Sequence, residues 1–133
     1  MSVPRDGYMD ETGTRQLRVL IVEDHDDLRE LLTQFLTMAG YEVRQARCAD
    51  TALEMATSWP FDVALIDIGL PRKDGIQLMR ELREQRSVVA VALTGYGMES
   101  HVRACRDAGF AAHLLKPVEA ETLLEVLHRL RAA

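Results

Sequence analysis

The chain has 133 residues, a length that suits one domain and is too short for two with ordinary cores. Its formal net charge of −5 argues against a general role in binding nucleic-acid backbones, which calls for a basic face. No apolar run approaches the roughly 20 residues of a membrane span. The two cysteines, Cys48 and Cys105, have neither metal-ligand nor redox-motif spacing, so we expect both to pack in or near the core of a cytoplasmic protein.

Regular alternation of elements begins at residue 17. Residues 1–16 are mostly polar without an apolar core, which predicts a disordered lead-in before a domain spanning 17–133. Apolar runs predict strands at 17–22, 41–46, 63–66, 88–93 and 112–115. Helical periodicity follows each run, with apolar residues at 28–39, 52–56, 76–82, 98–105 and 123–130. Gly40 and Gly109 are placed to end the first and fourth helices, and the pair Trp59-Pro60 is placed to end the second.

This order of elements predicts an α/β fold. Five strands alternating with five helices imply a parallel sheet with helices on both faces, because parallel strands need crossover connections. The runs at 63–66 and 88–93 are wholly apolar, as central strands are, whereas 41–46 alternates with outward charges, as an edge strand does. The common doubly wound order is 2-1-3-4-5, the flavodoxin-like arrangement. It places the first and third strands side by side, and ligands bind there beyond the carboxyl ends.

Polar residues stand where four of these predicted strands end. Glu23 and Asp24 follow the first strand, Asp67 the third, Thr94 the fourth and Lys116 the fifth. Each has an ordinary structural explanation: a helix N-cap or a solvated loop position for the acidic residues, with Asp24 placed to cap the first helix, a cap for Thr94 and a surface position for Lys116. All of them nevertheless fall on one predicted edge of the sheet, and this shared position favours a functional site.

The residue types in this cluster suit phosphoryl transfer. Three carboxylates crowded together repel one another, and Mg2+ with oxygen ligands is the simplest way to hold them. Asp67 would be the nucleophile that forms an aspartyl phosphate. Lys116 would pair with one phosphate oxygen and the Thr94 hydroxyl would donate to another.

The same segments resemble the receiver domain of two-component response regulators, from about residue 18 to the C-terminus. The resemblance rests on 20–24, on 67–75 with its Pro71 and Asp74-Gly75, on 93–95 and on 115–117. Four such segments in order at this spacing are specific, and the sequence around 93–97 and 112–117 looks most like receivers of hybrid histidine kinases.

The resemblance implies that a histidine kinase or a histidine phosphotransfer protein donates a phosphoryl group to Asp67, with Mg2+ required. It implies metal ligation by Asp24, by Asp67 and by the backbone carbonyl of Gly69, with Glu23 acting through water. A Lys116–Pro117 cis peptide bond is frequent in the family. The expected signalling surface is formed by the fourth helix, the fifth strand and the fifth helix, and its downstream protein target stays open.

Three positions depart from the usual pattern. Glu23 replaces the commoner aspartate, and its longer arm suits ligation through water. His113 stands where many receivers carry an aromatic switch residue; it could rotate in the same way or be a half-exposed edge-strand residue with no such role. Gly69 and Tyr96 occupy positions that often tune the lifetime of the aspartyl phosphate, and we hypothesise that Tyr96 shields it from water.

Other functions fit the residues less well. An aspartyl-phosphate phosphohydrolase resembling haloacid dehalogenases needs an acid two residues after its nucleophile, where this chain has Gly69. A flavin-binding module would place hydroxyls and glycine in the first loop, whereas the acidic segment 23–27 would repel a phosphate. A degenerate receiver that serves only for docking is disfavoured by the intact cluster. We therefore expect a phosphoacceptor signalling domain and not an enzyme for external substrates.

Overall fold

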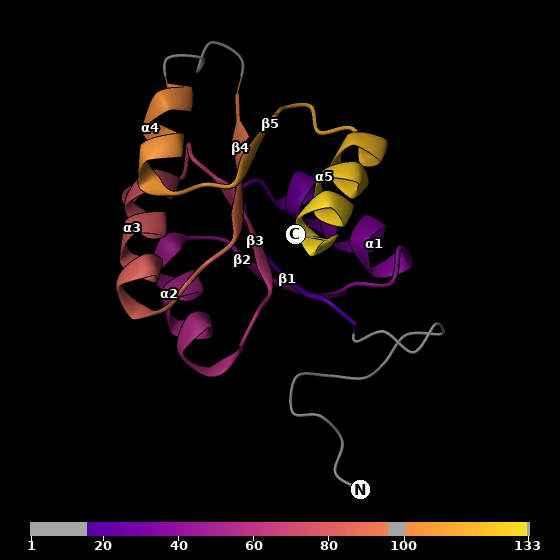
Figure 1. Cartoon of the computed structure of the whole chain (residues 1–133), viewed down its shortest axis with the longest axis horizontal. Helices are drawn as coiled ribbons and strands as arrows, with labels where there is room; N and C mark the ends of the chain where they lie inside the picture. The colour runs from indigo at the N-terminus through magenta and orange to yellow at the C-terminus, as the bar shows by residue number, and fades with distance from the viewer. Residues whose placement is uncertain (1–15, 96–100, 133) are drawn as a thin grey trace, which may run out of the picture.

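The computed structural model describes residues 16–95 and 101–132, and these residues form five strands that alternate with five helices (Figure 1). The strands are β1 (Arg18–Val22), β2 (Glu42–Ala46), β3 (Val63–Asp67), β4 (Ala90–Thr94) and β5 (Ala112–Leu115). The helices are α1 (Asp26–Met38), α2 (Ala49–Ser58), α3 (Gly75–Gln85), α4 (His101–Ala108) and α5 (Ala120–Ala132). Residues 1–15 of the predicted lead-in and Tyr96 lie outside the described residues.

The five strands form one parallel sheet in the order β2-β1-β3-β4-β5, which confirms the predicted topology. The register pairs Val22 with Ile66 and Asp67 with Leu93. Because all strands run the same way, their carboxyl ends share one edge. The loops after β1, β3, β4 and β5 therefore leave the sheet side by side.

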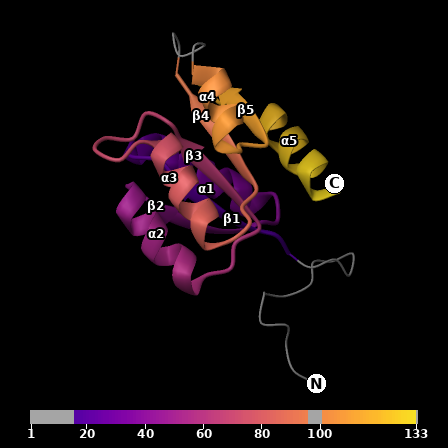
Figure 2. The same cartoon turned by 60° about the vertical axis from the view of Figure 1, so that its left-hand side comes forward.

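Helices cover the sheet on both faces. Figures 1 and 2 show α2, α3 and α4 on one face and α1 with α5 on the other. Alternate residues of the buried strands divide between the two cores: Leu20 and Ile66 pack toward the first group of helices, and Ile21 and Leu65 pack toward the second. Burial on both sides explains why β1, β3 and β4 read as continuous apolar runs.

The start of β4 differs from the sequence prediction. The strand was expected from residue 88 but begins at Ala90. Its ladder with β3 starts at the pair Ala64 and Ala90, so Val88 and Val89 precede the paired region, and Val89 is exposed. Apolar character therefore extended the predicted strand two residues ahead of the paired ladder, although the Val89 carbonyl still accepts from the Ala64 N–H at 3.0 Å. Among the described residues, no helix combines the length and apolar character that crossing a membrane requires.

Candidate functional site

Asp67 is the last residue of β3, and its carboxylate is buried with a separate partner for each oxygen. Oδ1 accepts a hydrogen bond from the Gly69 backbone N–H at 2.9 Å, and Oδ2 lies 3.2 Å from Nζ of Lys116. The side chain is only 5% exposed. Burial keeps the carboxylate away from bulk water, and the two partners fix its orientation.

The loop after Asp67 is held in place where α3 begins. The Gly75 N–H donates to the carbonyl of Ile68 at 3.2 Å, so the loop closes on itself. A Cβ at Gly75 would lie 2.4 Å from the Asp67 carbonyl oxygen, a separation that side chains do not tolerate. Asp74 caps α3 by accepting from the Gln77 N–H, while the Gln77 side chain accepts from the Asp74 N–H. Close backbone packing and the cap together position the loop that carries Gly69.

Glu23 follows β1 and has no exposed side-chain surface. Its Oε1 lies 2.7 Å from Nζ of Lys116. Its Oε2 accepts from the His25 backbone N–H at 3.0 Å and lies 3.0 Å from Nδ1 of the same histidine. Glu23 is thus held by a lysine on one oxygen and by a histidine on the other.

Asp24 does not cap α1, so that structural explanation for it is wrong. The N-cap residue is His25, and its side chain makes no cap hydrogen bond. Oδ1 of Asp24 is buried and has no hydrogen-bond partner among the residues the structure describes. Nδ1 of His25 lies 3.7 Å from this oxygen. A buried carboxylate oxygen without a donor costs free energy, and a bound cation would remove that cost.

Lys116 joins the acidic loops after β1 and β3. Burial disfavours its charge, but the hydrogen bond to Glu23 and the negative charges of Asp67 and Glu23 outweigh this effect, so the pKa of Lys116 is raised. Its backbone N–H donates to the Thr94 carbonyl at 2.8 Å, and the Lys116–Pro117 bond is cis, as the resemblance implied. The lysine therefore stays charged between the two carboxylates.

The remaining predicted residues lie around this centre. Thr94 ends β4 next to Leu93, which pairs with Asp67; its hydroxyl is buried and donates to the Leu114 carbonyl at 3.3 Å. His113 lies on β5, which forms the edge of the sheet, and is exposed. Its switching role stays a prediction, as does the shielding role of Tyr96.

Sequence reasoning missed two residues that support the site. Arg29 is buried, and its guanidinium donates to the Glu23 carbonyl at 2.9 Å while pairing with Asp26 at 2.6 Å. This hydrogen bond from α1 holds the backbone of the acidic loop at Glu23. The available signal was spacing, because Arg29 falls on the same helical face as Leu32 and Leu36. The second is His25, which the sequence showed only as a polar residue after the acidic pair.

The acidic loops can hold a divalent cation. One ligand atom from each of Glu23, Asp24, His25 and Asp67 can be chosen so that all lie within 4.8 Å of one another. Opposite oxygen ligands of Mg2+ lie roughly 4.2 Å apart, given ligand distances of about 2.0–2.1 Å. Three acids against one partly buried lysine leave negative charge to be balanced. The donor set and the unpartnered Asp24 oxygen therefore fit a hard divalent ion.

Comparison with known proteins identifies the class. The family model described as response regulator receiver domain matches residues 19–128, and the chain belongs to this family. A putative response regulator from Chloroflexus aurantiacus J-10-fl has a structure that superposes with a TM-score of 0.83 at 32% sequence identity, covering 90% of this chain and 100% of that one. Fold, motifs and family thus agree.

Curated relatives are longer proteins that contain such a domain. A cyclic di-GMP phosphodiesterase of Thermotoga maritima is 36% identical over 117 residues, which are 86% of this chain and 31% of that protein. The transcriptional regulatory protein PdtaR of Mycobacterium tuberculosis is 35% identical over 111 residues, 83% of this chain and 54% of that protein. The chain spans between about a third and a half of these relatives, so the similarity concerns the receiver domain.

Proposed function

We propose that the domain accepts a phosphoryl group onto Asp67 from a phosphohistidine donor, a histidine kinase or a histidine phosphotransfer protein, in a two-component or phosphorelay pathway. The observation that carries the proposal is the bridge of Lys116 between Glu23 and Asp67 beside an unpartnered Asp24 oxygen. This combination supplies a nucleophile, a fixed positive charge and a cation site at one sheet edge. The expected setting is the cytoplasm.

In the proposed transfer, an Asp67 carboxylate oxygen attacks the phosphorus atom. The bond from phosphorus to the donor's imidazole nitrogen breaks, and the imidazole leaves with its electron pair, so that an acyl phosphate forms. Water later hydrolyses this acyl phosphate to Asp67 and inorganic phosphate. Transfer of this kind depends mainly on in-line positioning and on charge stabilisation.

The chain's own groups supply that stabilisation. Lys116, already 3.2 Å from the Asp67 carboxylate, would move its charge to a phosphate oxygen. The Thr94 hydroxyl would exchange the Leu114 carbonyl for another phosphate oxygen. A bound Mg2+ would neutralise negative charge on the incoming group, held by Asp24, Asp67 and the Gly69 carbonyl, with Glu23 acting through water.

Movement of Thr94 toward the phosphate would change the conformation of the surface formed by α4, β5 and α5. The hydrogen bond from the Thr94 hydroxyl to the Leu114 carbonyl links β4 to β5, and His113 immediately precedes Leu114 on β5. Rotation of His113 is the proposed response, and Tyr96 is the proposed shield of the phosphate. The partner that reads this surface is proposed to be a protein, without direct binding to nucleic acid.

A phosphoacceptor role is favoured over turnover of an external substrate. The position two residues after Asp67 is Gly69, which has no side chain to serve as a general acid. The phosphodiesterase activity in the name of the Thermotoga maritima relative belongs to a protein of which this chain covers 31%. The only chemistry proposed here is self-directed phosphorylation and autodephosphorylation.

Mass spectrometry of the intact protein tests the proposal. The wild type and Asp67→Asn are incubated with acetyl phosphate, each with Mg2+ or with EDTA. We expect a mass gain of one phosphoryl group in the wild type with Mg2+ only. An equal gain in Asp67→Asn would place the modification elsewhere, and no gain in any sample would favour a receiver used only for docking.

A further inference from the structure

We propose that His25 is an additional ligand at the cation site and makes the site accept transition-metal ions, such as Co2+, in preference to Mg2+. The inference rests on the proposed function, because the ion concerned is the one expected beside Asp67. It goes further in assigning a nitrogen ligand from this chain. An all-oxygen site suits Mg2+, whereas imidazole nitrogen suits metals later in the first transition series.

The position of His25 carries the inference. It is the last of the three residues between β1 and α1, and its Nδ1 lies 3.0 Å from Oε2 of Glu23 and 3.7 Å from Oδ1 of Asp24. One of its ring nitrogens can be grouped with oxygens of Glu23, Asp24 and Asp67 within 4.8 Å. The imidazole therefore lies inside the group of atoms that would surround the ion.

The side-chain partners of the His25 ring are Glu23 and Asp24, which are both proposed to hold the same ion. His25 occupies the N-cap position of α1 without making a side-chain cap bond, and the side chain is 72% exposed, so it can reorient. The backbone N–H of His25 is held separately by Glu23 at 3.0 Å, which fixes the residue while the ring turns. The next acid, Asp26, already pairs with Arg29 and Arg47 and does not compete for the imidazole.

Metal binding would replace the contact between the His25 imidazole and Glu23 with a bond to the ion. In the metal-free protein, Nδ1 of the imidazole contacts Oε2 of Glu23 at 3.0 Å. With an ion bound, the neutral imidazole that carries its proton on Nε2 would donate the Nδ1 lone pair to the metal in place of that contact. The unpartnered Oδ1 of Asp24 lies on the same side, 3.7 Å away, and would bind the same ion. Affinity at such a mixed site rises along the series from Mn2+ to Cu2+.

The test compares Co2+ with Mg2+ in three proteins: the wild type, His25→Ala and His128→Ala. His128 is an exposed histidine on α5 that lies outside the cluster, so its variant controls for binding at surface histidines. Co2+ binding is followed by its visible absorption, and Mg2+ binding by calorimetry. Circular dichroism of each variant confirms that the fold is retained.

We expect His25→Ala to weaken Co2+ binding by at least about tenfold, because loss of an outer-shell partner alone weakens metal binding by about that much. Its absorption band should shift, since an oxygen replaces a nitrogen ligand, while its Mg2+ affinity should change less than about twofold. His128→Ala should match the wild type in every measurement.

Two results would overturn the inference: an unchanged Co2+ band and affinity in His25→Ala, or an equal loss of Co2+ and Mg2+ affinity in that variant. Neither result bears on the proposed function, which fails only if Asp67→Asn gains a phosphoryl group as the wild type does or if the wild type gains none. The two experiments therefore separate a failure of metal selectivity from a failure of phosphoryl transfer.

Discussion

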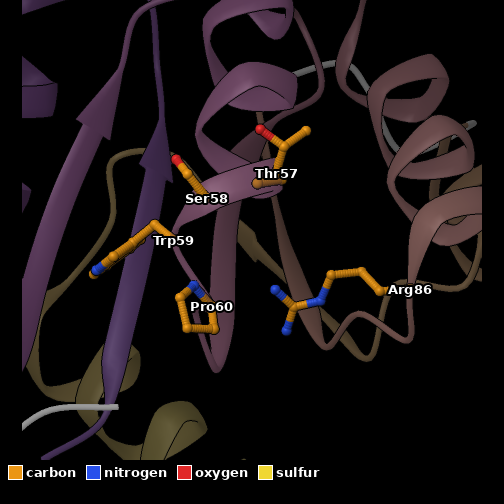
Figure 3. A pocket seen from close by; sticks show the side chains of 6 residues that line it. Thr57, Ser58, Trp59, Pro60 and Arg86 are labelled. Atoms are coloured by element: carbon orange, nitrogen blue, oxygen red, sulfur yellow. The ribbon is translucent and has the colours of Figure 1, made fainter. Parts of the chain in front are cut away.

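The two ends of the sheet balance their charges in different ways. At the amino end, a hollow of about 360 Å3 is lined by Pro60 and Arg86 among others. Figure 3 shows the Arg86 side chain pointing toward Pro60. The Arg86 guanidinium donates to the Phe61 carbonyl at 2.8 Å and stacks on the Phe61 ring at 4.5 Å. Arg44 stacks in the same manner over Trp59, at 4.8 Å. These guanidinium groups contact a carbonyl oxygen and aromatic rings.

The carboxyl end keeps an excess of acid instead. Glu23 and Asp67 share Lys116, and Asp24 retains a buried oxygen without a hydrogen bond among the described residues. Grouping like charges in this way destabilises a metal-free domain and prepares it for a cation. The comparison teaches that hollows alone do not mark the functional end of this fold; unbalanced charge does.

The largest expected effect comes from crowding the loop at the carboxyl end. Gly75→Ala would place a methyl group against the Asp67 carbonyl and the Ile68 Cα, at 2.4 and 2.7 Å. We expect the free energy of unfolding to fall by about 3 kcal/mol, the upper end for overpacking, because backbone atoms cannot yield. Gly69→Ala is the matched control, since its Cβ would lie 3.4 Å from Oδ1 of Asp67. Urea unfolding measures both, and similar values would contradict the close packing.

Mg2+ should stabilise the folded protein through its carboxyl end. At a free concentration 100 times the dissociation constant, binding only to the native state adds about 2.7 kcal/mol. Asp24→Asn should reduce this gain strongly while slightly raising the stability of the metal-free protein, because one repelling charge is removed. Thermal unfolding with and without Mg2+ measures both terms. An undiminished Mg2+ effect in the variant would show that the ion binds elsewhere.

At the amino end, Arg86→Ala should lower stability without touching the cation site. It removes the hydrogen bond to the Phe61 carbonyl and the stacking on the Phe61 ring. We expect a loss of about 1–2 kcal/mol in urea unfolding, with Mg2+ affinity unchanged. Arg80→Ala, on the exposed side of α3, is the control. A change in Mg2+ affinity in Arg86→Ala would contradict the claim that contacts at the amino end do not affect the cation site.

The smallest effect concerns the thiols. Cys48 lies beyond the carboxyl end of β2, and its hydrogen bond with Thr51 lowers the pKa of the thiol, whereas burial raises the pKa of Cys105 in α4. More thiolate is therefore present at Cys48 as pH rises toward neutrality. Iodoacetamide at pH 7 should alkylate Cys48 at least roughly tenfold faster than Cys105. Peptide mass spectrometry over time measures the two rates, and faster reaction at Cys105 would contradict the assignment.

The fold was accessible from sequence because its signals are local and repeated. Apolar runs ended by Asp67 or Thr94 gave the strands, and parallel topology brought their ends together. Arg29 and His25 were missed because their roles depend on where α1 lies relative to the acidic loop, which periodicity does not specify. The beginning of β4 was misplaced for a similar reason, since Val88 and Val89 are apolar but lie ahead of the ladder with β3.

Two-dimensional amide NMR during a Mg2+ titration tests the central claim, that excess acid at the carboxyl ends of the strands binds a cation beside Asp67. We predict shifts at the amides of Asp24, Gly69 and Lys116, with Phe61 and Ser87 at the amino end unaffected. Shifts that concentrate at Phe61 and Ser87, or an unchanged spectrum at saturating Mg2+, would contradict it.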